Sequence, residues 1–257
     1  MLGPIAEPSR EPIPILYRDD RLVVVDKPAG LFVHRSALDR TADAALQRVR
    51  DQLGRHVWPV HRLDRPTSGA LCFALDPEAA SFLGTAFSEG RVEKTYLAVV
   101  RGHPLETSTI DRALVPLNPD GHGLKTGSEP QEAKTEIRVL ATTEQPWPVG
   151  PYPTARYALV EARPKTGRRH QIRRHLAGAN HPIVGDHRHG DHRHNKAFAS
   201  RLGVASLLLH AAQIRLPQPD GSSVTATAPL PDAWRAVVDA FGWSDPLDTM
   251  FDGRRVR

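Results

Sequence analysis

The sequence predicts an α+β domain: a mixed, largely antiparallel central sheet with flanking helices. Short apolar runs rich in β-branched residues outnumber the helical repeats, and Leu22-Val23-Val24-Val25 is a clear example. Many successive runs are joined by connections too short to hold a crossover helix, which favours antiparallel pairing. The chain has 257 residues, enough for one such domain with a substantial core.

The expected elements alternate along the chain. Strands are expected at 15–27 (a hairpin), 68–75, 92–100, 110–115, 135–142, 156–162, 207–216 and 224–228. Helices are expected at 41–54, 77–88, 167–176 and 231–241. Thr41 is a candidate N-cap and Gly54 a stop, while Asp76 caps a helix with Pro77 at its first position. We expect a flexible arm at 1–13, one catalytic domain at 14–242 and a tail at 243–257.

Composition limits the possible partners and compartments. Lys and Arg number 34 against 29 Asp and Glu, and the resulting charge of +5 is a weak indication of a polyanionic partner such as RNA. The single cysteine, Cys72, excludes an internal disulfide and fits a reducing compartment, so a cytoplasmic protein is expected. The start of the chain lacks the apolar region of a secretory signal, and no stretch approaches 18 apolar residues, so no membrane partner is expected.

The run 61–69 contains the strongest chemical signal. Asp64 lies between Arg62 and Arg65, just before an apolar strand. Neighbouring positive charge favours the ionised carboxylate, which suits a nucleophile or base held in a cleft. A salt bridge in a loop is the alternative interpretation. His61 fits either a catalytic role or a half-buried histidine bonded to the main chain.

Two further segments carry candidate site residues. Lys94 and Tyr96 alternate along one strand face, and Tyr96 is either a core residue or an aromatic platform for a flipped base. In the basic run 165–175, Arg169 and Arg173 lie one helical turn apart. If Ile172 is buried, part of the charge must turn inward, and an inward arginine requires an anion; Asp64 is the obvious candidate.

The other arginines of this run, Arg168, Arg169 and Arg174, are then available for phosphates. A solvated basic face is the alternative. A histidine-rich run follows at 181–195 and raises the question of a metal site. His187, His189, His192 and His194 are interleaved with arginines that would repel a divalent cation, so an RNA-contacting loop is favoured over a metal site.

Taken together, these segments resemble the RluA-type pseudouridine synthases over residues 12–230. The matching motifs, in the family's order, are Leu22–Leu31, His61–Asp64 with Thr67–Gly69, Lys94–Tyr96, Thr166–Arg168 with His170–Arg173, His181–Asp186 and Leu208–Ala211. The resemblance implies the pseudouridine synthase catalytic fold. It also implies an isomerase that breaks the bond between uracil and ribose, turns the base and rejoins it through carbon. No cofactor or metal is implied.

The resemblance also implies residue roles. Asp64 matches the catalytic aspartate, which attacks either sugar or base; Tyr96 matches the tyrosine that stacks on the target base, and Arg173 the arginine that pairs with the aspartate. Arg62 matches the residue that enters the RNA stack, and Leu208 or Leu209 is expected against the base. The full expected set of substrate-binding residues is Arg62, Arg65, Lys94, Arg168, Arg169, His170, Arg174, Leu208 and Leu209.

Softer features, among them Arg65-Pro66 and Gly185-Asp186, place the chain nearest the branch that modifies position 65 of transfer RNA. We therefore expect a monomer that acts on transfer RNA, with ribosomal RNA as the alternative substrate. Two other classes stay open: an RNA-binding protein without catalysis, and a metal-dependent hydrolase that uses the 187–194 histidines.

Overall fold

The computed structural model describes residues 11–34, 42–118 and 123–243. Within these ranges one ten-stranded sheet has the order β1-β2-β4-β9-β5-β8-β7-β6, with β10 paired to β9 and β3 to β4. The strands are β1 Ile15–Arg18, β2 Leu22–Lys27, β3 Trp58–Pro59, β4 Ser68–Ala74, β5 Glu93–Arg101, β6 Thr107–Asp111, β7 Lys134–Gln145, β8 Ala155–Pro164, β9 Leu209–Pro217 and β10 Ser223–Thr227. The pairing of β4 with β9 is parallel and the other described strand pairings are antiparallel, which confirms the predicted α+β class.

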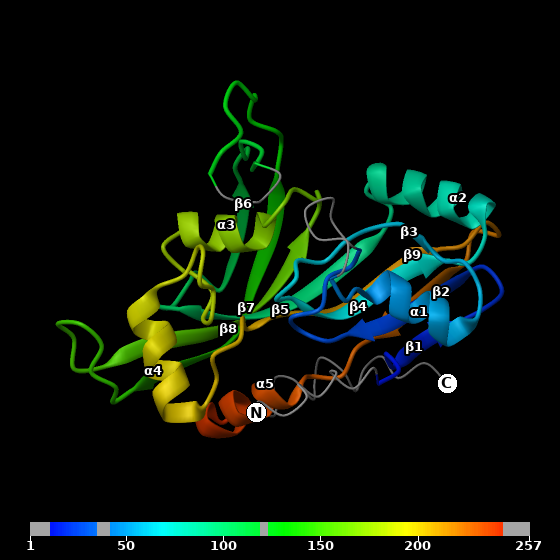
Figure 1. Cartoon of the computed structure of the whole chain (residues 1–257). Helices are drawn as coiled ribbons and strands as arrows, with labels where there is room; N and C mark the ends of the chain where they lie inside the picture. The colour runs from blue at the N-terminus through cyan, green and yellow to red at the C-terminus, as the bar shows by residue number, and fades with distance from the viewer. Residues whose placement is uncertain (1–10, 35–41, 119–122, 244–257) are drawn as a thin grey trace, which may run out of the picture.

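Five helices are described: α1 Ala45–Leu53, α2 Pro77–Ser88, α3 Gln171–Gly178, α4 His192–Leu202 and α5 Asp232–Phe241. Figure 1 shows α2 and α3 above the strands and α4 and α5 below them. The space between α2 and α3 matters for the site, because side chains from both helices line the same cavity there. No helix in the described ranges is long and apolar enough to cross a membrane.

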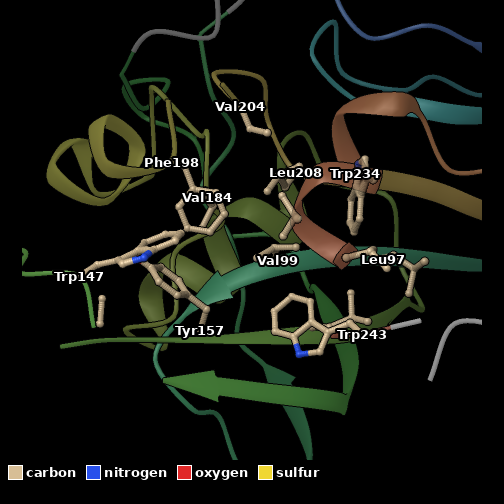
Figure 2. Close-up of a cluster of buried hydrophobic side chains, with 14 of the residues drawn as sticks. Leu97, Val99, Trp147, Tyr157, Val184, Phe198, Val204, Leu208, Trp234 and Trp243 are labelled. Carbon is tan, nitrogen blue, oxygen red and sulfur yellow. The ribbon is translucent and has the colours of Figure 1, made fainter. Parts of the chain in front are cut away.

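An aromatic core supports the side of the sheet opposite that cavity. Figure 2 shows Trp147, Tyr157 and Phe198 close together, with Leu208 and Trp234 further along the same cluster. Successive side chains of a strand point to opposite faces of the sheet. When one residue is buried in the aromatic cluster, the next residue along the strand therefore faces the cavity side. Leu208 thus lies in the aromatic cluster, while Leu209 lines the cavity.

Strands β4 and β9 approach so closely that only glycine fits between them at one point. Gly69 has a φ of 107°, and an added Cβ would lie 2.3 Å from the carbonyl oxygen of Ala211. This is shorter than any ordinary contact, and the positive φ is also unfavourable for other residues. The close approach brings the segment before β4, which carries Asp64, next to β9 and the strands beyond it.

Several element boundaries differ from the prediction. Residues 192–195 were expected to belong to a loop, and nothing was predicted for 196–202. Together they form α4, because the Asp191 side chain accepts a hydrogen bond from the Arg193 backbone N–H and Phe198 is buried. The strand expected at 110–115 is β6, shifted to Thr107–Asp111. The short strand β3 was not expected. Residues 1–10 of the expected arm and 244–257 of the expected tail lie outside the described residues, whereas Ile13 and Trp243 are buried.

Candidate active site

A cavity of about 660 Å³ lies between the segment before β4, strand β5 and the facing parts of α2 and α3. Nine of the expected site residues line it: Arg62, Asp64, Lys94, Tyr96, Arg168, Arg169, His170, Arg173 and Leu209. They come from segments far apart in the chain. A concave site with convergent polar groups is the ordinary form of an active site, so this cavity is the candidate.

Asp64 is held at the cavity by a turn and an ion pair. Its carbonyl accepts a hydrogen bond from the Thr67 backbone N–H, which closes the turn before β4. One carboxylate oxygen, Oδ2, accepts from Arg173 Nη1 at 2.9 Å, although the residues are 109 positions apart. The inward arginine expected from the basic run therefore does meet Asp64. Such a charge-assisted hydrogen bond fixes the direction of the carboxylate. The helix expected at 167–176 begins only at Gln171, so Arg169 precedes α3 and does not share a helical face with Arg173.

Asp186 holds Arg173 from behind and was missed as a site residue. Arg173 Nε and Nη2 donate to the two oxygens of Asp186 at 2.7 and 2.8 Å. Burial by itself would raise the pKa of Asp186, but the guanidinium and the backbone N–H groups of His189 and Arg188 lower it to about 2. Arg173 is therefore a bridge between a buried carboxylate and the cavity carboxylate. The only sequence signal was an aspartate after Gly185 in the resemblance motif.

Tyr96 and Lys94 both reach the cavity because alternate residues of β5 share one face of the strand, as the sequence predicts. The register of β5 against β9 shifts at Tyr96, because two residues of β9, Ala211 and Ala212, lie opposite Tyr96 alone. Burial raises the pKa of Tyr96 above its ordinary value, and the negative charge of Asp64 raises it further. The phenol thus stays protonated at neutral pH and offers an apolar ring with one O–H donor.

Lys27 is a second residue that the sequence reasoning did not single out. Its side chain is fully buried, and Nζ donates to the carbonyl oxygens of Pro28, Leu31 and Arg65 at 2.9, 2.8 and 3.2 Å. Burial lowers the pKa of Lys27 to about 7, while the charge of Asp64 opposes the shift. Three acceptors need three N–H groups, so these contacts favour the ammonium form. This cation ties the segment after β2 to the segment that carries Asp64.

Replacing Lys27 with methionine is expected to destabilise the fold. The change leaves three carbonyl oxygens without a donor and removes a positive charge near Asp64, so the free energy of unfolding should fall by about 3 kcal/mol. Urea unfolding at pH 7 measures this. Lys134→Met, which removes an exposed lysine paired with Asp111, is the matched control and should cost less than about 0.5 kcal/mol. Equal losses in the two variants would show that the buried ammonium is unimportant.

Three expected binding residues lie away from the cavity. Arg65 points elsewhere: its Nε donates to the Gly30 carbonyl at 2.9 Å and its guanidinium lies 4.6 Å from the centre of the Phe32 ring. Arg174 follows Arg173 on α3 and therefore projects about 100° around the helix from it. Leu208 is fully buried in the aromatic cluster, so of the two expected leucines only Leu209 faces the cavity.

Arg168 and Arg169 line the cavity and also contact the long connection between β6 and β7. Arg168 Nε donates to the Glu132 carbonyl at 3.0 Å, and Arg169 Nη1 donates to the Asn118 carbonyl at 2.8 Å. These contacts hold both arginine side chains in place beside the cavity.

His61 plays a structural part in the described fold. Its Nε2 accepts a hydrogen bond from the Cys72 backbone N–H at 2.9 Å, and its ring stacks on Phe87. Burial lowers its pKa to about 3, so the ring is neutral. Of the two interpretations of this residue, the contacts favour the histidine bonded to the main chain.

The histidines of 187–194 do not converge. His189 bonds to His170, while His194 Nδ1 lies 2.9 Å from the Tyr157 hydroxyl on the other side of the segment. In the described part of the chain no three histidine, cysteine or acidic side chains come together as metal ligands. Two aspartates of the run 181–195 have structural contacts instead. Asp186 accepts hydrogen bonds from Arg173, and Asp191 caps α4.

Comparison with known proteins gives a consistent result. The family model described as RNA pseudouridylate synthase matches residues 21–178. Proteins named tRNA pseudouridine synthase C are similar over most of the chain: the one from Pectobacterium carotovorum is 46% identical over 91% of this chain, and the one from Yersinia pestis is 45% identical over 90%. The alignments span 63% of the Pectobacterium protein and 91% of the Yersinia protein.

Two solved structures whose names also contain "RNA Pseudouridylate Synthase" superpose on this chain. Human RNA Pseudouridylate Synthase Domain Containing 1 superposes with a TM-score of 0.68 at 28% identity, covering 88% of this chain and 87% of that one. Human RNA Pseudouridylate Synthase Domain Containing 4 has a TM-score of 0.67 at 29% identity, covering 88% and 92%.

Proposed function

Because this chain belongs to the RNA pseudouridylate synthase family, whose members convert uridine to pseudouridine in RNA, we propose that it performs this isomerisation on a uridine of transfer RNA. The observation that carries the proposal is the pair formed by Asp64 and Arg173 inside a cavity that also contains Tyr96. The names of the relatives support transfer RNA as the substrate. Such an enzyme would act in the cytoplasm, and the cavity is complete within one chain, which supports a monomer.

The reaction needs a nucleophile but no net redox change. The bond between N1 of uracil and C1′ of ribose breaks, and a bond between C5 and C1′ forms. The proton on C5 leaves, and N1 ends with a proton, so the atoms balance. In this proposal Asp64 is the nucleophile, and Arg173 holds its second oxygen so that the carboxylate stays aimed into the cavity.

The other lining residues fit the handling of a flipped nucleotide. We propose that the Tyr96 ring stacks on the extruded uracil, with Leu209 as an apolar contact beside it. Arg62 is exposed at the cavity and is proposed to fill the gap in the RNA stack. Lys94, Arg168 and Arg169 supply positive charge for phosphates along the approach.

Tritium release tests the function directly. RNA transcribed with uridine labelled by tritium at C5 loses the label to water only when C5 is joined to C1′. We expect release of about one equivalent from unmodified transfer RNA and almost none from ribosomal RNA fragments. Tritium release from ribosomal RNA alone would show that ribosomal RNA, and not transfer RNA, is the substrate. RNA binding without tritium release from any RNA would favour a non-catalytic binding protein.

The phosphate role of Arg168 predicts a change in salt dependence. Arg168→Ala should weaken RNA binding and reduce the slope of log affinity against log salt by about one unit, because one phosphate contact is lost. Fluorescence titrations at several salt concentrations measure the slope. The matched control is Arg235→Ala, which removes an exposed arginine of α5, the helix packed on the opposite side of the sheet. Equal slopes for Arg168→Ala and the unchanged protein would mean that this side chain does not touch the RNA backbone.

A further inference from the structure

His170 is held in a strained conformation at the cavity. It precedes α3 with a φ of 54°, in the left-handed region that residues other than glycine enter at a cost. Among the described residues other than glycine, only Asn180 shares a positive φ. Strain of this kind persists where surrounding structure enforces it, and it concentrates at functional sites. The strained backbone directs the imidazole towards Asp64, with Nε2 3.8 Å from Oδ1.

A second histidine holds the ring of the first. Nδ1 of His170 lies 3.0 Å from Nε2 of His189, and the two rings meet edge to face. His189 is fixed in turn, because its backbone N–H donates to Asp186 Oδ1 at 3.0 Å. Asp186 also holds Arg173. The catalytic carboxylate is therefore approached from two sides by groups that are anchored at the same buried aspartate.

The two oxygens of Asp64 have different surroundings. Oδ2 accepts the hydrogen bond from Arg173, whereas Oδ1 faces His170 at a separation longer than a hydrogen bond. Oδ1 is the oxygen that the arginine leaves available for attack. A group that steadies Oδ1 without binding it tightly would preserve its reactivity.

The tautomer of His170 follows from electrostatics. A ring nitrogen with a lone pair would repel the carboxylate, whereas an N–H directed at Oδ1 is attractive. His170 then carries its proton on Nε2 and accepts a hydrogen bond at Nδ1, so His189 must donate its Nε2–H. We propose that His189 is a positioning residue that fixes the tautomer and direction of His170, so that the Nε2–H of His170 steadies the reactive oxygen of Asp64. This inference rests on the proposed function.

Burial, helped by neighbouring cations, favours the neutral form of both rings. Burial lowers the pKa of His170 to about 4; Asp64 opposes the shift, while Arg173, His189 and Arg169 add to it. Burial also lowers the pKa of His189, with Asp186 opposing and Arg173, Arg174 and Arg188 contributing. Protonating His170 would set two N–H groups against each other and break the pair. Without His189, His170 can take a second proton, and the imidazolium would then bind Oδ1 and suppress attack.

The test compares two replacements of His189 across pH. In His189→Leu, single-turnover tritium release at pH 7.5 should fall about 10-fold or more, with RNA affinity unchanged, because the direction of His170 is lost. The acid limb of the rate should also move to higher pH by about one unit. His189→Gln should restore most of the rate, because the glutamine Nε2–H can donate to His170 Nδ1. His103→Gln, at an exposed histidine away from the cavity, is the control.

Two results would overturn the inference. One is a wild-type rate and pH profile in His189→Leu. The other is equal slowing by leucine and glutamine with the acid limb unmoved, which would indicate only packing. Nitrogen-15 NMR of the wild-type protein, labelled in its histidine rings, measures the tautomer of His170 at pH 7.5. A proton on Nε2 is expected, and a proton on Nδ1 would contradict the proposal. Because NMR needs no turnover, it separates failure of this inference from failure of the proposed function.

Discussion

Asp64→Asn is expected to abolish pseudouridine formation, with a rate loss of about 10⁴-fold or more. The amide keeps the size of the side chain and can still accept a hydrogen bond from Arg173, but it is not a nucleophile. RNA affinity should stay within about twofold, because binding depends on phosphate contacts made by other side chains. Single-turnover tritium release measures the rate, and a filter-binding titration measures the affinity.

An exposed aspartate provides the control for this variant. Asp239→Asn changes the same functional group on α5, far from the cavity-lining residues, and should retain the full rate. If Asp64→Asn also released tritium at close to the normal rate, Asp64 would not be the nucleophile, and the assignment of this cavity would be lost with it.

Arg173→Lys is expected to impair both catalysis and stability although it preserves the charge. Arginine makes three hydrogen bonds here, two to Asp186 and one to Asp64, from a planar group. A lysine ammonium cannot reproduce this geometry, so Asp64 loses its orientation and Asp186 loses one partner. The rate should fall about 10²-fold or more, and the free energy of unfolding should fall by about 2–3 kcal/mol.

The pH dependence of stability identifies the cause of this loss. Arg173 helps to lower the pKa of Asp186 to about 2 in the folded state, below the ordinary 3.8, so the ionised pair contributes stability above pH 4 that is lost as pH falls towards 2. In Arg173→Lys that pKa rises, and acid unfolding should begin at higher pH. The control is Arg215→Lys, at an exposed arginine paired with exposed Glu93, which should change stability by less than about 0.5 kcal/mol. An unchanged acid transition in Arg173→Lys would refute the bridging role.

Local patterns in the sequence were sufficient for much of the fold. Apolar runs with β-branched residues predicted most strands, and Asp76 with Pro77 predicted the start of α2, where the Asp76 side chain caps the Ala79 N–H. The prediction missed α4, because residues 192–196 are mostly basic or histidine and show no apolar helical repeat. The apolar residue that packs this helix against the core is Phe198. A cap at Asp191 and a glycine stop at Gly203 were present but lay at the edge of a polar run.

The site was predictable where one charge required another. Burial of Ile172 and Leu176 required an anion for the inward Arg173, and Asp64 is that anion, 109 positions away in the sequence. Asp186 and the link from His189 to His170 were not predictable, because they depend on how the segment after α3 folds back against α3. Lys27 was hidden for a related reason: nothing in a strand pattern shows that a lysine is buried among carbonyl groups.

The most direct test of the account is a map of pseudouridine in cellular RNA. Mass spectrometry of transfer and ribosomal RNA, from cells with and without this protein, compares every uridine position at once. We expect one pseudouridine of transfer RNA to disappear when the protein is removed, and to return with the wild-type protein but not with the Asp64→Asn variant. Identical pseudouridine maps in the two cell types would contradict it.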